Sequence, residues 1–296
     1  MVVEWRELLD NKTREENRTG VLMLEAYSTL DQTMRYYGTS SAPGGHFPFN
    51  FLFITDVHYE PESSAEEISA TINKYLDQIT DGRTPNWVLG NHDQHRVASR
   101  FVPELVDGLN FLAQLLPGVA VTYNGEEIGM ENTNITWEQC VDPQGKNAGP
   151  DGYLEATRDL ERTPFQWDNT TSAGFSENET TWLPVNENYK QLNLEAQKAA
   201  EKSHYKVYKQ LTALRNKPAI KEERTHVAAL SDGVLGFTRT LENEESYVVV
   251  VNFRNEEEVV NVKEKLNEVP DVITMRILSI NSDHMERPRN VRYGSD

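Results

Sequence analysis

Cysteine is almost absent from this 296-residue chain, and Cys140, the only one, cannot form a disulfide bond within it. Long apolar runs are missing as well. The best of them, residues 247–253, has the length of a strand and falls far short of the roughly 18 residues that span a bilayer. The first ten residues lack the basic region and the apolar core of a signal peptide. The sequence therefore predicts no disulfide framework and no membrane span within this chain.

Basic residues are in the minority, with 29 Lys and Arg against 47 Asp and Glu, which gives a formal net charge of −18. Such a balance argues against nucleic acid and anionic membrane surfaces as partners and fits a protein that acts on a neutral substrate. The hydrophobic fraction of 38% is enough for a core. Glycosylation sequons, which favour secretion only weakly, begin at Asn11, Asn17, Asn134, Asn169 and Asn178.

What the chain does contain is a short apolar strand that ends on polar side chains. Residues 87–89 are Trp, Val and Leu, and Gly90 is followed by Asn91, His92 and Asp93. A parallel α/β protein places its chemistry at the carboxyl ends of its strands, so this position favours a functional site. The alternative is structural, because Asn and Asp after a strand also form turns and cap helices.

Strand-like and helical patterns alternate along the first 125 residues. The end of an amphipathic helix at residues 2–10 is followed by a polar loop at 11–20. The predicted strands are residues 21–24, 49–54, 87–89 and 119–123, and the predicted helices are residues 29–37, 63–79 and 97–116. This order predicts right-handed βα units around a parallel sheet. Because Glu25 and Asp93 both follow buried strands, both should project at the same mouth of that sheet.

The pattern changes in the second half of the chain. Residues 129–189 are loop-like, and their three tryptophans and two phenylalanines favour an ordered wall over a linker. A helix is predicted at residues 195–216. Strand-like runs follow at residues 227–230, 234–240, 247–253, 259–262 and 272–280. We expect an α/β domain over residues 1–217 and a small antiparallel β domain over residues 218–296.

Two carboxylates at one mouth, with a histidine beside one of them, are what hydrolysis of a glycosidic bond requires. One group must protonate the leaving oxygen, and the other must face the anomeric carbon. Apolar neighbours favour Glu25 as the acid, because desolvation keeps a carboxyl group protonated. Asp93 has a polar setting that keeps it ionised. The structural alternative is that these carboxylates only cap helices or pair with Arg96 and Arg35.

A metal site is not expected in this chain. His46, His58, His92 and His95 show no tight ligand spacing, and the last two alone are too little for a zinc site.

Several longer motifs resemble a known family and come in that family's order. The chain has VLMLEAYS at residues 21–28, GNHDQHR at 90–96, GVAVTYNGEEIGM at 118–130 and ERTPFQWD at 161–168. Together they resemble the glycoside hydrolase family 13 α-glucosidases of the α-amylase superfamily, and most closely the insect maltases. SAGFS, WLPVNENYK and VLGFTRTLENEESYVVVVNF extend the resemblance over nearly the whole chain.

The resemblance implies the C-terminal half, strands 5–8, of a (β/α)8 TIM barrel, followed by the family's β domain. It implies that Glu25 is the general acid/base and that Asp93 stabilises the transition state. It also implies that His92, Arg162 and Tyr123 bind the substrate. The whole enzyme would release glucose from the non-reducing end of maltose, sucrose or short α-glucans, with retention of configuration.

Two motifs of the family are missing: the G-x-R-x-D motif, whose Asp is the nucleophile, and an earlier D-x-x-x-N-H motif. Met1 is therefore expected to be an internal methionine of a longer protein, or the start of a truncated gene, and the chain alone to be inactive. Half a barrel leaves two sheet edges unpaired, so poor stability and aggregation are expected. The resemblance places any calcium site and any signal peptide in the missing half, and no cofactor is expected in this chain.

The family also implies a secreted or membrane-anchored protein at a gut or salivary surface, with an α-glucoside as its small-molecule partner. Membrane anchoring outside this chain and the oligomeric state stay open. An alternative from another functional class is a non-catalytic α-amylase-like protein, either a transporter heavy-chain subunit or a gut surface receptor. The retained Glu25, His92 and Asp93 favour the enzyme.

Overall fold

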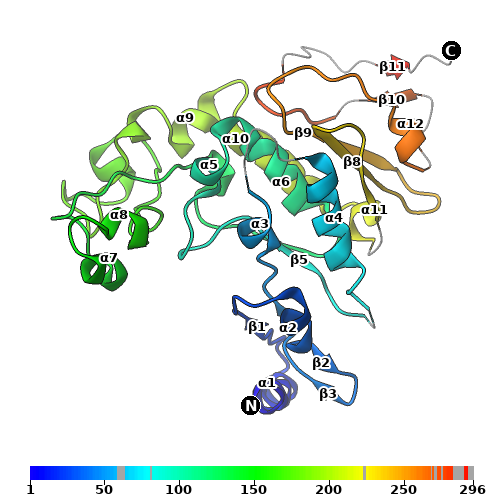
Figure 1. Ribbon diagram of the computed structural model, residues 1–296, viewed down its shortest axis with the longest axis horizontal. Helices are drawn as coiled ribbons and strands as arrows, with labels where there is room; N and C mark the ends of the chain where they lie inside the picture. Colours follow the sequence, from blue (N-terminus) through cyan, green and yellow to red (C-terminus); the bar gives the residue numbers. More distant parts are fainter. Residues whose placement is uncertain are drawn as a thin grey trace.

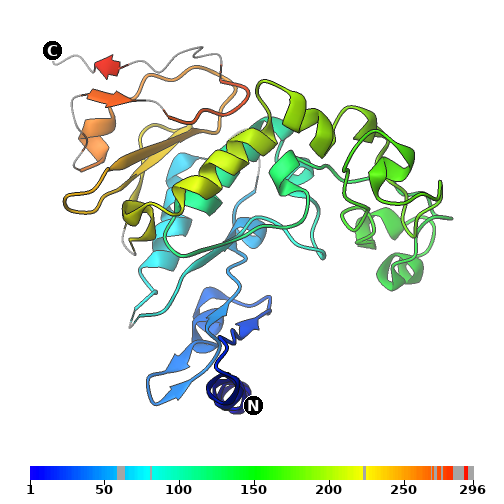
Figure 2. The same cartoon turned by 180° about the vertical axis from the view of Figure 1, so that it is seen from behind.

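The computed structural model describes residues 1–58, 64–80, 82–222, 225–267, 269, 272–274, 276–282 and 290–292. The chain passes from an N-terminal part through central strands and helices to a loop-rich lobe (residues 129–190), and then to a C-terminal sheet. Figures 1 and 2 show the loop-rich lobe and the C-terminal sheet on opposite sides of the central helices. Among the described residues, no helix combines the length and the apolar character that a bilayer crossing needs.

The described strands are β1 (Met23–Leu24), β2 (Gly38–Thr39), β3 (Ala42–Pro43), β4 (Phe47–Pro48), β5 (Asn86–Val88), β6 (Val119–Val121), β7 (Val227–Ala229), β8 (Val234–Arg239), β9 (Tyr247–Asn252), β10 (Val272–Thr274) and β11 (Asn290–Arg292). The described α-helices are α1 (Val2–Glu16), α2 (Leu30–Arg35), α3 (Leu52–Thr55), α4 (Ala65–Leu76), α5 (Val97–Arg100), α6 (Val106–Leu115), α7 (Pro143–Ala148), α8 (Tyr153–Ala156), α9 (Leu194–Ala199), α10 (His204–Leu214), α11 (Pro218–Lys221) and α12 (Val262–Lys265). Short 3₁₀ helices are η1 (Pro103–Leu105), η2 (Glu126–Ile128), η3 (Thr171–Gly174) and η4 (Glu187–Lys190).

Four parallel strands form the scaffold of the first half, as two pairs. β1 pairs with β4 and β5 pairs with β6, both in parallel register. No ladder joins β4 to β5 in the described part of the chain, and the side chain of Asn86 connects them instead. Its Nδ2 donates to the carbonyl of Pro48 at 2.7 Å, and its Oδ1 accepts from the backbone N–H of Asn50 at 2.8 Å. The spatial order is therefore β1, β4, β5 and β6, as expected for consecutive strands of a barrel.

The second predicted strand, residues 49–54, is wrong. The strand β4 ends at Pro48, before this range begins, and residues 52–55 form the helix α3. The cause is the side chain of Asn50, whose Oδ1 accepts the backbone N–H of Leu52 at 3.1 Å and turns the chain out of the strand.

Two long predicted helices are each interrupted in the structure. Residues 97–116 contain α5, η1 and α6, because Pro103 forces Val102 into extended backbone. Residues 195–216 contain α9 and α10. The break follows the extended residue Ala200, and Ser203 caps the new helix by accepting the backbone N–H of Lys206 at 3.3 Å.

Other boundaries also differ from the predictions. The polar loop expected at residues 11–20 is helical as far as Glu16, because charges one turn apart pair along α1, as Arg6 does with Asp10 at 2.9 Å. The strand expected at residues 259–262 is absent, and α12 begins there instead. In the stretch 272–280 only β10 is a strand among the described residues. The predicted helix start at Ser63 lies outside the described residues, and Ser64 caps α4.

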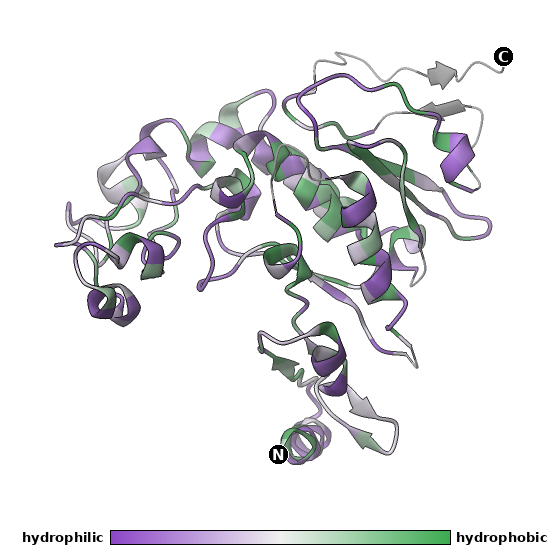
Figure 3. Cartoon of the chain, in the orientation of Figure 1, coloured by the Kyte–Doolittle hydropathy of each residue, from purple (hydrophilic) through white to green (hydrophobic). Residues whose placement is uncertain are grey.

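The C-terminal sheet, antiparallel in the order β7, β8, β9, packs on the helices of the first half. One apolar cluster contains Ile72 of α4, Leu109 of α6, Leu211 of α10, and Phe237 and Val249 of the sheet. Figure 3 shows apolar colouring on α6 and on the strands β8 and β9. The sheet therefore shares its core with the helices, and the domain boundary at residue 217 stays a prediction.

We predict that Asn86→Ala lowers the free energy of unfolding by roughly 2–4 kcal/mol, because it leaves the buried partners of both strands without their hydrogen bonds. Urea denaturation followed by circular dichroism measures this. The exposed Asn216→Ala is the matched control and should change stability by about 0.5 kcal/mol or less. Equal midpoints for Asn86→Ala and the wild type would show that β4 and β5 are held together by something else.

Candidate active site

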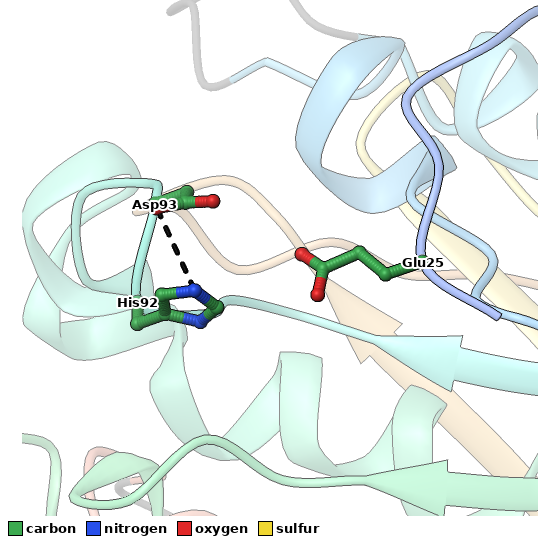
Figure 4. A group of neighbouring side chains, drawn as sticks. All are labelled: Glu25, His92 and Asp93. Carbon is green, nitrogen blue, oxygen red and sulfur yellow. Dashed lines mark ion pairs between the residues drawn. The ribbon is translucent and has the colours of Figure 1, made fainter. Parts of the chain in front are cut away.

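The side chains of Glu25, His92 and Asp93 converge where the strands β1 and β5 end. Glu25 directly follows β1, and the other two come after the turn at Gly90 that ends β5. One ligand atom from each residue lies within 4.8 Å of the others. Figure 4 shows the carboxylate of Glu25 pointing toward His92 and Asp93, and His92 Nε2 lies 3.6 Å from Asp93 Oδ1. The parallel strand pairs thus bring the sequence-predicted residues to one mouth.

The expected setting of Glu25 is wrong. Its apolar neighbours in sequence suggested a desolvated carboxyl group, but the side chain is exposed in the described structure. The reason is that β1 lies at the open edge of the strand array, where Val21 and Met23 are also half exposed.

A pocket of about 250 Å³ lies beside Glu25 and His92. Its apolar wall consists of Phe49, Phe51, Val88 and Val121, and its polar lining includes Glu25, Asn91, His92 and Tyr123. Tyr27 stacks on Phe51 with ring centroids 4.4 Å apart, and its hydroxyl accepts from Asn91 Nδ2 at 2.7 Å. The combination of flat aromatic surface and polar groups suits a sugar, which offers C–H faces as well as hydroxyls.

Two arginines from the loop-rich lobe bind the carboxylate of Asp93. Arg158 Nη1 donates to Asp93 Oδ1 at 2.9 Å, and Arg162 Nη2 donates to the same oxygen at 2.5 Å. Arg162 Nε also donates to the carbonyl of His92 at 2.6 Å. The predicted residue Arg162 thus lies in the site, and Arg158 is a neighbour that sequence reasoning missed. Its only signal was a second arginine four residues earlier in the same loop.

The two ion pairs that the structural alternative expected, with Arg96 and Arg35, do not form among the described residues. Arg96 donates instead to the carbonyl of Asn124 at 2.6 Å and lies over the ring of Tyr123. In the described part of the chain, no ion pair joins Arg35 to Glu25 or Asp93.

Tyr123 lies in the pocket wall at the end of β6. Its hydroxyl donates to the carbonyl of Glu161 at 3.0 Å, which ties the strand end to the loop-rich lobe. Burial raises the pKa of this phenol, so the hydroxyl stays a hydrogen-bond donor at neutral pH. A contact that the sequence does not reveal therefore places Tyr123 in the wall of this pocket, and its role in substrate binding stays a prediction.

Glu126, which belongs to the motif at residues 118–130 and to which the sequence assigned no role, is a buried carboxyl group behind the pocket. Its Oε2 accepts the backbone N–H of Tyr123 at 2.9 Å, while its Oε1 has no hydrogen-bond partner in the described structure and lies against Gly90. Burial raises its pKa from the ordinary value near 4.5 to about 8, although Arg100 and Arg96 act in the opposite direction. At neutral pH this group is therefore mainly protonated.

The cluster of Glu25, His92 and Asp93 has ligand atoms close enough to hold a metal ion. However, Asp93 Oδ1 already accepts two guanidinium groups, whose positive charge disfavours a cation at the same carboxylate. That this chain holds no metal stays a prediction.

We predict that Glu126→Gln changes the pH dependence of stability. The folded chain keeps the Glu126 proton up to about pH 8, whereas the unfolded chain releases it near pH 4.5. The stability that this carboxyl group provides is complete below the lower value and is lost as the pH rises through the upper one. The Tm of Glu126→Gln relative to wild type should therefore rise by several degrees between about pH 5 and about pH 9.

Differential scanning fluorimetry across this range measures the difference. The exposed Glu155→Gln serves as control and should show a constant difference. A constant difference for Glu126→Gln as well would mean that its carboxyl group titrates alike in the folded and unfolded chain.

Comparison with known proteins identifies the family. Residues 1–223 match the model for the α-amylase catalytic domain. An α-glucosidase of Apis mellifera is 41% identical over 283 residues, which cover 96% of this chain and 48% of that protein. Maltase A1 of Drosophila melanogaster is 40% identical over 94% of this chain and 48% of its own length. The chain thus spans about half the length of the curated relatives it matches.

Solved structures agree with this result. The trehalulose synthase of Pseudomonas mesoacidophila superimposes with a TM-score of 0.71 and 25% identity, over 84% of this chain and 50% of that one.

Among the relatives found by sequence, an amino acid transporter heavy chain of Rattus norvegicus is also similar, at 29% identity over 94% of this chain and 39% of its own length. The predicted fold, half of a (β/α)8 barrel followed by a small sheet, is confirmed. The chain belongs to the α-amylase catalytic-domain family, that is, to glycoside hydrolase family 13.

Proposed function

We propose that this chain supplies the acid/base half of the active site of a retaining α-glucosidase. The observation that carries the proposal is the convergence of Glu25 with the His92–Asp93 pair at one mouth, within 4.8 Å. The relatives named α-glucosidase and maltase support this reaction class.

In the proposed mechanism Glu25 protonates the departing glycosidic oxygen and afterwards, as a carboxylate, deprotonates the incoming water. Asp93 binds the hydroxyls of the glucosyl ring together with His92, and this binding strengthens as the ring flattens and positive charge develops. The two arginines on Asp93 Oδ1 leave Oδ2 for the sugar, since no described group donates to it.

The group that attacks the anomeric carbon is not assigned to this chain. We propose that it comes from the preceding half of the barrel, on a strand that would pair with the open edge at β1. The full-length protein, meaning this chain together with that half, would be the active enzyme. No metal or other cofactor is proposed for this half of the site.

The proposed substrates are maltose, sucrose and short α-glucans, with glucose released from the non-reducing end. The neutral charge of these sugars fits a mouth at which the carboxylate of Asp93 pairs with Arg158 and Arg162. One solved structure of the trehalulose synthase was determined in complex with sucrose. A location outside the cell, secreted or anchored at a gut or salivary surface, is proposed from relatives such as a salivary α-glucosidase of Anopheles gambiae.

A second candidate is a non-catalytic subunit, which the similarity to the rat transporter heavy chain favours. The exposed Glu25 beside an arginine-bound Asp93 is the observation against it, because a binding protein has no need of a proton donor at this mouth. Hydrolysis by the full-length protein separates the two candidates.

We predict that residues 1–296 alone do not hydrolyse maltose, while the full-length protein does. In the latter, Glu25→Gln should lower kcat by roughly 100- to 10,000-fold, because the leaving oxygen loses its proton donor. Release of glucose, followed by a coupled assay, measures both.

The exposed Glu177→Gln is the matched control and should keep wild-type kcat. Turnover by the isolated chain that vanishes in Glu25→Gln would refute the assignment of the attacking group to the preceding half. Full activity of Glu25→Gln in the full-length protein would refute its role as acid/base.

A further inference from the structure

Asp142 is a buried carboxylate of the loop-rich lobe, and both of its oxygens accept hydrogen bonds from Arg158. Its Oδ1 accepts Arg158 Nη2 at 2.7 Å, and its Oδ2 accepts Arg158 Nε at 2.9 Å and the Arg158 backbone N–H at 2.8 Å. The side chain of Asp142 is fully buried. This guanidinium holds the pKa of Asp142 well below its usual range, so the pair stays ionised.

The carboxylate of Asp159 fixes the segment that carries Asp142. Its Oδ2 accepts the backbone N–H groups of Val141 at 2.7 Å and Asp142 at 2.9 Å. Asp159 is itself buried. Asp159 thus holds the segment that carries Asp142, and Asp142 binds both the side chain and the backbone of Arg158. These contacts restrict the orientation of the guanidinium group.

The remaining edge of that guanidinium faces the sugar site. Arg158 Nη1 donates to Asp93 Oδ1 at 2.9 Å, in the planar fork geometry that lets arginine bind two carboxylates at once. Figure 4 shows the carboxylate of Asp93 on the side that faces Glu25. The contact fixes one oxygen of Asp93 and leaves the other free for a ligand.

Arg162 binds the same oxygen of Asp93, but fewer contacts hold its own guanidinium group in place. Its other described contact is the carbonyl of His92, and no described carboxylate other than Asp93 lies within ion-pair distance of it. The described contacts of the Arg162 guanidinium group are thus with His92 and Asp93, whereas Arg158 is also held by Asp142.

We infer that Arg158, held by Asp142, is a positioning residue that orients Asp93 for the transition state without touching the sugar. The inference rests on the function proposed above and adds a residue to it. Loss of the arginine lets Asp93 adopt other rotamers, and small misplacement of a stabilising group can cost up to roughly 100-fold in rate. The expected loss falls on kcat, because the ground-state contacts of the substrate remain.

A double-mutant cycle in the full-length protein tests this role, with kcat and KM for maltose measured for the wild type, Arg158→Met, Asp93→Asn and the double variant. Arg158→Met should lower kcat by roughly 10- to 100-fold with little change in KM. In the Asp93→Asn background it should cause little further loss, since the residue acts through Asp93. Losses that multiply in the double variant would overturn the inference.

Two further variants keep the test decisive if Arg158→Met folds poorly. Arg158→Lys retains the charge but cannot bridge both carboxylates, so it should fold and still lose kcat. Wild-type kcat in Arg158→Lys would overturn the inference. Arg254→Met, which breaks a pair with Asp232 on the distant C-terminal sheet, is the control and should keep kcat.

Failure of the inference and failure of the proposed function give different results. Absence of α-glucoside hydrolysis by the full-length wild type rejects the proposed function, and the role of Arg158 with it. Hydrolysis by the wild type together with independent effects of the two substitutions rejects only the role of Arg158.

Discussion

The ends of β1 and β5 can lie close together only if the two parallel strand pairs of this chain lie side by side. One buried side chain, that of Asn86, joins the two pairs. Asn86 belongs to β5, and its amide binds backbone groups at the end of β4. A side-chain amide can do this because it carries a donor and an acceptor in the same plane, like a peptide group. Through this junction the end of β1, with Glu25, and the turn after β5, with Asp93, come to face each other.

The loop-rich lobe provides the second constraint. It contributes no strand to the scaffold in the described structure, yet its arginines reach the carboxylate at the end of β5 and its backbone accepts the hydroxyl of Tyr123. Two arginines of a chain with a net charge of −18 thus bind one acidic side chain. In the proposed reaction, a carboxylate that two guanidinium groups hold in place would face the positive charge that develops on the sugar.

Much of the scaffold could be predicted from the sequence, because short apolar runs and polar strand ends are local signals. The existence of the helix α4, and the placement of Glu25 and Asp93 at one mouth, follow from such signals. Residues 49–54 were predicted wrongly, because their apolar pattern is that of a strand. The side chain of Asn50 turns the chain there instead, and Asn86, which lies 36 residues away, binds Asn50. Arg158 was missed because its anchor and its target lie in different parts of the chain. The exposure of Glu25 depends on the open sheet edge and not on its neighbours in sequence.

We propose that this chain holds the acid/base and the stabilising carboxylate, while the attacking carboxylate lies in the preceding half of the barrel. Trapping the covalent glucosyl intermediate of the full-length protein with a 5-fluoro-α-glucosyl fluoride, followed by peptide mass spectrometry, tests it most directly. The account predicts the label on an aspartate of a peptide that precedes Met1. A label on Asp93, Glu25 or any other carboxylate of residues 1–296 would contradict it.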